Sequence, residues 1–176
     1  AITSFTPTSG KTGQVVNITG TNLTGATAVS FGGTAARSFA VVSATSINAT
    51  VGAGASGSVS VTTAAGTGTR AGFTYLPPPT ITSFSPTSAG TGQTVTITGT
   101  NFTGVTAVRF GNTAASSFTV VSATSITAVV GAGATGNVRI VTANGNTNRA
   151  GFTFISATPA PAITSFTPTS GKTGQV

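Results

Sequence analysis

The sequence has 176 residues, with seven Lys and Arg and no Asp, Glu or His, which gives a formal net charge of +7 at pH 7. Cys, Met and Trp are also absent, whereas Ser and Thr fill 58 positions and Gly fills 24. A chain without carboxylates, imidazoles or thiols cannot build a carboxylate general base, a catalytic triad, a zinc site or a disulfide. The calcium sites that stiffen some domain junctions are not expected either. The composition therefore predicts no enzyme, no metal and no cofactor.

Internal repetition organises the chain. Residues 1–75 align without a gap with residues 80–154, and 51 of the 75 positions are identical. A third copy begins at 162–176, which is identical to 1–15. The repeats predict the following division: domains at 1–76 and 80–155, Pro-rich linkers at 77–79 and 156–161, and the start of a third repeat at 162–176.

The predicted elements follow a period of two along each copy. In Thr94–Thr98, two apolar residues face one side and three threonines the other. Arg109 and Arg139 each stand between two apolar neighbours, and Phe152 and Phe154 flank a threonine. Such alternation is typical of strands with one buried face. Six or seven short strands per copy, separated by Gly-rich turns, predict an all-β antiparallel sandwich.

The phenylalanines take the apolar positions of this pattern. Phe5, Phe31, Phe39 and Phe73, with their copies 79 residues later, are expected to pack in the core rather than to form a sugar-stacking platform. No apolar run reaches the length of a membrane-spanning helix.

The third copy allows two interpretations. Because a fragment of this size cannot bury a core of its own, the sequence is expected to be a window on a longer array. Alternatively, the segment that includes Ile163, Phe166 and Val176 inserts into a neighbouring molecule by strand exchange. The Pro-rich linkers are expected to act as stiff spacers in either case.

Both copies resemble IPT/TIG domains, the immunoglobulin-like modules of plexins, Rel-type transcription factors and many bacterial surface proteins. The resemblance rests on ITSFSPTSAGTGQTVTITGTNFTGVTAVRFGNTAA at 81–115 and SFTVVSATSITAVVGAGATGNVRIVTANGN at 117–146. It includes Pro after the first strand, the Gly-x-x-Val-x-Ile-x-Gly strand, a turn Asn at Asn22 and Asn101, and the Val-x-Phe-Gly strand. The resemblance implies tandem immunoglobulin-like sandwiches in a secreted or cell-surface protein.

The chain departs from this family pattern in lacking acidic residues. Family members usually carry acids near Gln14 and Ala44 and near their copies, Gln93 and Ala123. Two explanations are open: selection for a charge that does not depend on pH, or a sequence read from a density map in which carboxylates were taken for other residues.

The seven cations are scattered along the sequence, and this spacing argues against a nucleic-acid footprint. Between the two complete copies, only Arg70 and Arg149 recur at equivalent positions. We expect them to cap backbone carbonyls or to lie over an aromatic ring, with inter-domain or polyanion contacts as the functional alternative. Asn-x-Thr sequons at Asn17, Asn22, Asn48 and Asn101 are possible glycosylation sites.

The sequence therefore predicts a structural repeat of an extracellular fibre, filament or cell-surface stalk. Its main partner would be itself, because surfaces rich in Thr and poor in charge repel one another little. Cell-wall or extracellular polysaccharide is a second possible partner, and neither nucleic acid nor a membrane span is expected. The alternative function is a carbohydrate- or receptor-binding adhesin module of a larger secreted protein.

One prediction follows from composition alone. Because only the chain termini titrate between about pH 2 and 10, the proton balance between folded and unfolded states hardly changes with acid. We expect an unfolding temperature that is nearly constant from about pH 2 to 8 in a calorimetric series. A steep loss of stability below about pH 5 would reveal carboxylates and contradict the sequence as given.

Overall fold

The computed structural model describes residues 1–133, 135–157, 161–165 and 167, and the regular structure in them is β. Domain 1 contains β1 (Ile2–Thr6), β2 (Ser9–Gly10), β3 (Val15–Gly20), β4 (Ala28–Phe31), β5 (Thr34–Ala35), β6 (Ser38–Ser43), β7 (Ser46–Thr50), β8 (Gly57–Thr63) and β9 (Gly66–Tyr75). Domain 2 contains β10 (Thr80–Ser85), β11 (Ser88–Ala89), β12 (Thr94–Thr100), β13 (Val105–Phe110), β14 (Thr113–Ala114), β15 (Ser117–Ser122), β16 (Ser125–Val129), β17 (Gly136–Thr142) and β18 (Gly145–Phe154). None of the described segments is a helix that could cross a membrane.

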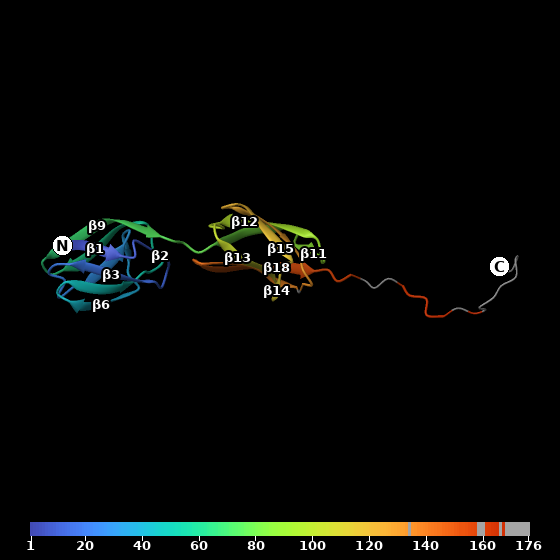
Figure 1. Cartoon of the computed structure of the whole chain (residues 1–176), viewed down its shortest axis with the longest axis horizontal. Helices are drawn as coiled ribbons and strands as arrows, with labels where there is room; N and C mark the ends of the chain where they lie inside the picture. The colour runs from blue at the N-terminus through green and yellow to red at the C-terminus, as the bar shows by residue number, and fades with distance from the viewer. Residues whose placement is uncertain (134, 158–160, 166, 168–176) are drawn as a thin grey trace.

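Each domain is a sandwich of two sheets (Figure 1). In domain 1 the strand orders are β1-β3-β7-β6 and β2-β9-β8-β4-β5, and domain 2 repeats both orders with β10-β12-β16-β15 and β11-β18-β17-β13-β14. Seven strands in each domain have at least four residues, as predicted, and two have only two residues. The pairing is antiparallel except at β2–β9 and β11–β18, which are parallel. The predicted sandwich is thus confirmed, with one short parallel pair added at an edge of each domain.

The period of two buries one face of each strand between the sheets. Val16 and Ile18 of β3 are fully buried, whereas Val15 and Thr19 beside them are exposed. The aromatic rings fill the centre of each core: the Phe31 and Phe73 centroids lie 4.7 Å apart, and those of Phe110 and Phe152 lie 4.6 Å apart. Burial on this scale drives the folding of each domain. The expectation that the phenylalanines are core residues is confirmed, although Phe39 and its copy Phe118 are only half-buried.

Asn22 and Asn101 follow β3 and β12 in the left-handed region, with φ of 57° and 59°. Among residues with a side chain, Asn is one of the few that adopt this conformation readily. The structural reason for an Asn at this position of the family pattern is therefore the turn itself.

The two domains follow one another along a rod (Figure 1). Two side chains join them besides the prolines. Asn101 Nδ2 of domain 2 donates to Pro78 O in the linker at 3.0 Å, and Lys11 Nζ of domain 1 donates to Ala143 O in the β17–β18 turn at 2.7 Å. Asn101 thus holds the linker to domain 2, and Lys11 joins the two domains directly beside it.

The third repeat is described only at 162–165 and 167, which are not in a strand. Ile163 is 85% exposed. Phe166 and Val176 lie outside the described residues, so continuation into a third domain and strand exchange both stay predictions.

Candidate functional site

Arg70 and Arg149, the recurrent pair of the sequence, lie exposed on β9 and β18. Within the described part of the chain neither guanidinium donates a hydrogen bond to a carbonyl, and the aromatic contacts there are between phenylalanines. The expected capping role is therefore not observed. A role of these two residues in inter-domain or polyanion contacts stays a prediction.

The four sequons fall into two kinds. Asn17 and Asn48 are cross-strand neighbours on β3 and β7, and Asn17 Nδ2 donates to Asn48 Oδ1 and to Ser46 Oγ, both at 2.9 Å. Asn22 and Asn101 are exposed in turns. Glycosylation at any of the four stays a prediction, and the first pair would have to give up this amide contact.

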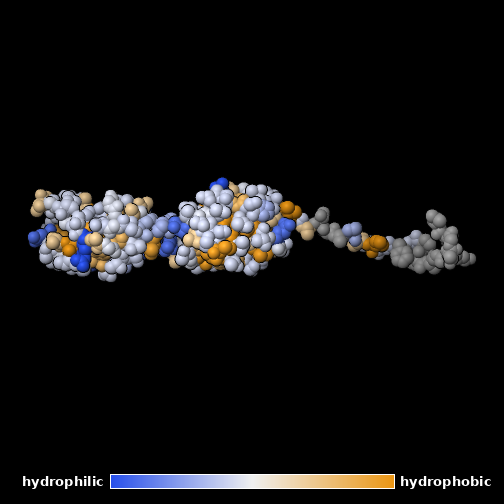
Figure 2. All heavy atoms as spheres, turned by 90° about the horizontal axis from the view of Figure 1, so that it is seen from above, coloured by the Kyte–Doolittle hydropathy of each residue, from blue (hydrophilic) through white to orange (hydrophobic). Residues whose placement is uncertain are grey.

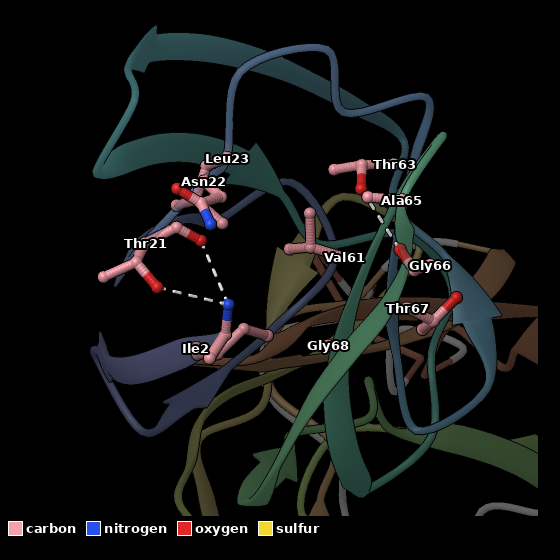
Figure 3. A pocket seen from close by; sticks show the side chains of 11 residues that line it. Ile2, Thr21, Asn22, Leu23, Val61, Thr63, Ala65, Gly66, Thr67 and Gly68 are labelled. Carbon is pink, nitrogen blue, oxygen red and sulfur yellow. Dashed lines mark hydrogen bonds between the residues drawn. The ribbon is translucent and has the colours of Figure 1, made fainter.

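A pocket of about 440 Å³ opens at the end of domain 1 where the chain begins (Figure 3). The Ala1 amino group donates to Thr21 O at 3.0 Å on one side, and Thr63 Oγ1 donates to Gly66 O at 3.2 Å on the other. Its full lining is Ala1, Ile2, Thr21, Asn22, Leu23, Val61, Thr63, Ala65, Gly66, Thr67 and Gly68.

The same place in domain 2 receives the linker. Gly145 is the counterpart of Gly66, and a Cβ there would lie 3.0 Å from Pro78 Cβ. Asn101, the counterpart of Asn22, holds Pro78 O. The pocket of domain 1 therefore corresponds to the surface that contacts the linker in domain 2. Its shape can be explained without a ligand.

A different surface distinguishes the two domains: the outer face of the five-stranded sheet of domain 2. Arg109 of β13 lies directly opposite Arg139 of β17, and Arg139 lies opposite Asn148 of β18. Two further amide residues lie near this row, Asn112 in the β13–β14 turn and Asn137 at the β17 bulge. We call these five residues the Arg–Asn face.

The Arg–Asn face borders a shallow hollow of about 410 Å³. The hollow is lined by Gly111, Asn112, Thr135, Gly136, Asn137, Arg139 and Asn148. Arg109 lies beside it, and its Nη1 donates to Asn112 O at 3.2 Å. This bond fixes the Arg109 guanidinium next to the turn and leaves its other N–H groups free to donate outward.

Domain 1 carries none of these side chains at the equivalent positions. The counterparts of Arg109, Arg139, Asn148, Asn112 and Asn137 are, in that order, Ser30, Ser60, Thr69, Gly33 and Ser58. Ser30 Oγ and Ser60 Oγ share a hydrogen bond of 2.6 Å where domain 2 has two arginines. One scaffold thus carries a small hydroxyl face in domain 1 and a cationic amide face in domain 2.

The register corrects the expectation that the charges are scattered. Arg109 and Arg139 are 30 residues apart in sequence but face each other across adjacent strands. Like charges directly opposite each other destabilise a sheet, and the sequence contains no carboxylate that could neutralise them. The sequence did contain one indication of this pair: Arg109 and Arg139 both replace serines of the first copy, Ser30 and Ser60, at outward positions.

No described group of His, Cys, Asp or Glu could hold a metal ion. Every described aromatic side chain is buried or half-buried. On the side seen in Figure 2, pale residues cover much of both domains, and the hydrophobic residues in orange are most extensive on domain 2. The strongest polar groups on the described surface include a few amides and guanidinium groups.

Comparison with protein families gives one match, found twice: the IPT/TIG domain, at residues 1–76 and 79–156. The chain belongs to the IPT/TIG domain family. The resemblance expected from the sequence is thus confirmed for both domains. A comparison with curated proteins finds no match.

Several solved structures are similar in fold. One is the SGBP-B protein from a complex xyloglucan utilization locus in Bacteroides uniformis, 24% identical over 86% of this chain and 48% of that one, with a TM-score of 0.43. Another is a surface glycan-binding protein from Prevotella bryantii, 19% identical over 84% and 40%, with a TM-score of 0.41. The extracellular region of plexin A4 is 21% identical over 86% and 18%, with a TM-score of 0.40. The chain spans less than half the length of each.

The arginine pair yields a stability prediction. Changing Arg139 to Ser, its counterpart in domain 1, removes the cross-strand repulsion, so domain 2 should gain about 0.2–1 kcal/mol in free energy of unfolding at low salt. The gain in stability should shrink in about 1 M salt, because the screening length of electrostatic interactions is then only about 3 Å. Denaturant unfolding at both salt concentrations measures the change.

The matched control is Arg37→Ser, because Ser116 is the domain 2 counterpart of Arg37. This variant removes the same charge from domain 1 and should lack the salt-dependent gain. A loss of stability in Arg139→Ser, or an equal gain at both salt concentrations, would show that the two arginines do not repel each other.

Proposed function

We propose that this chain is a non-catalytic, carbohydrate-binding part of a larger extracellular protein, with the Arg–Asn face of domain 2 as its binding surface. The supporting observation is a difference between two domains that share one fold and 51 of 75 aligned residues. The cores match position by position, whereas the outer face of one sheet changes from hydroxyls to Arg and Asn. The five side chains of this face are exposed, so the change does not serve folding, which both domains already achieve.

The residue types of this face suit sugars. An Asn amide presents a carbonyl acceptor and two N–H donors, and this combination pairs with neighbouring sugar hydroxyls, which both donate and accept. Three such amides lie around one shallow hollow. An open hollow beside a flat sheet can accommodate a polymer that enters and leaves it, so the ligand is an extended polysaccharide rather than a small enclosed molecule.

This proposal reverses the order expected from sequence alone, in which a fibre came first and carbohydrate binding second. That order relied on surfaces rich in Thr and poor in charge. The observation that supports binding is instead a set of five side chains that domain 1 lacks at the equivalent positions. The names of the two SGBP-B-type proteins from Bacteroides uniformis and Prevotella bryantii also refer to glycans. The proposal, however, is based on the Arg–Asn face of this chain.

The test is binding of the full chain to a panel of neutral and acidic polysaccharides by affinity electrophoresis. We expect binding to at least one, and a loss of about tenfold or more when Asn112→Gly, Asn137→Ser and Asn148→Thr together restore the domain 1 residues. The control is Asn17→Thr with Asn48→Thr, which removes an amide pair from domain 1 and should leave binding unchanged. Equal losses in both variants, or no binding to any polysaccharide, would refute the proposal.

Self-association remains a second candidate function, favoured by the edge strands β6 and β15. Both are at the edge of a four-stranded sheet and carry no charged side chain. Val42 and Val121 are 61% and 62% exposed on them. Uncharged edges with exposed apolar residues are sites where sheets of two molecules can pair.

Sedimentation of the full chain over a range of concentrations tests this candidate. Association that increases with concentration and is abolished by Val42→Lys with Val121→Lys supports it, because a charge on an edge blocks pairing. Val15→Lys is the control, since Val15 is exposed on β3, between two other strands of its sheet. A monomer at every soluble concentration would exclude self-association of this chain through these edges.

A further inference from the structure

We infer that the Arg–Asn face binds an anionic sugar, through a carboxylate or sulfate group placed between Arg109 and Arg139. The inference rests on the proposed function and names its substrate class. Its starting point is that these two cations are direct cross-strand partners, so their side chains leave the sheet side by side. Directly opposite residues have Cβ atoms about 4.5–5.5 Å apart, which lets both guanidinium groups reach one anion.

No side chain of this chain can take the place of that anion. The sequence has no Asp or Glu, so no side chain of this chain can form an ion pair with either arginine. The other residues in line with the pair are Ala114 beyond Arg109 and Asn148 beyond Arg139, neither of which carries charge. A bound anion would therefore replace a repulsion by two attractions, and these are charge-assisted hydrogen bonds, the stronger kind.

The geometry also prepares the site. Arg109 Nη1 is held by Asn112 O, so this guanidinium does not have to be ordered on binding. Arg139 and Asn148 line the same hollow, together with Asn112 and Asn137. A guanidinium for an anionic group and amides for hydroxyls thus meet at one place, and a uronic acid or sulfated sugar carries both kinds of group on one ring.

The number of cations favours an acidic polysaccharide over nucleic acid. A nucleic-acid site neutralises several phosphates along a backbone and often stacks bases on aromatic side chains. The Arg–Asn face offers two cations and no aromatic side chain, and the described aromatic residues elsewhere are buried or half-buried. Domain 1 offers a built-in comparison, because its Ser30–Ser60 pair occupies the same place without charge.

The experiment measures binding of the full chain to two pairs of polymers. Polygalacturonate is compared with the same polymer after its carboxyl groups are reduced to alcohols, and dextran sulfate is compared with dextran. A single-stranded oligonucleotide is tested as well. We expect at least about tenfold tighter binding to one or both acidic polymers than to the neutral partner. Arg109→Ser with Arg139→Ser should bring that ratio close to one. The two acidic polymers distinguish a carboxylate from a sulfate as the anion, and either supports the inference.

The matched control is Lys11→Gly with Arg37→Ser, which introduces the domain 2 counterparts Gly90 and Ser116 and removes the same net charge from domain 1. If it lowers the ratio as much as the domain 2 variant, the attraction belongs to the overall charge and the inference fails. Equal binding to acidic and neutral polymers, still lost in the triple Asn variant, would overturn the inference and keep the proposed function. No binding to any polysaccharide overturns both, and tighter binding to the oligonucleotide than to either acidic polymer overturns the sugar assignment.

Discussion

The packing of two sheets through alternate apolar side chains is the interaction on which the rest of this structure depends. The chain has no carboxylate, thiol or imidazole, so ion pairs between side chains, disulfides and metal sites are not available to it. What remains is burial of apolar surface and the backbone hydrogen bonds between strands. Rings such as Phe110 and Phe152, 4.6 Å apart, close each core. Because the inner faces carry the stability, the outer faces are free to differ.

The two domains use that freedom unequally. Their buried positions are almost the same, down to the aromatic pairs and the left-handed Asn after β3 and β12. Their outer faces differ where β13, β17 and β18 carry Arg109, Arg139 and Asn148. The facing arginine pair and the amides beside it are therefore found on domain 2 and not on domain 1. Domain 1, joined to it by Lys11 and the linker, extends the rod.

The features that depend on residues close together in the sequence could be predicted from it. Alternation around Arg109 and Arg139 correctly placed both side chains outward, and the repeat and its motifs gave the fold and the family. The pairing of strands that are far apart in the sequence could not be predicted in this way. β13 and β17 are separated by three other strands, yet they are neighbours in the sheet, so seven cations that look scattered along the chain include a facing pair. The Lys11–Ala143 contact escaped prediction for the same reason, since it joins residues of different domains.

An NMR titration of the full chain with an acidic oligosaccharide tests the central claim, that the binding surface is the face that distinguishes domain 2 from domain 1. Each amide of one domain has a counterpart in the other, so the molecule carries its own control. The account predicts shifts that gather on β13, β17, β18 and the turn at Asn112, with the counterparts on β4, β8 and β9 unchanged. Equal shifts at equivalent positions of both domains, or shifts confined to the edge strands β6 and β15, would contradict it.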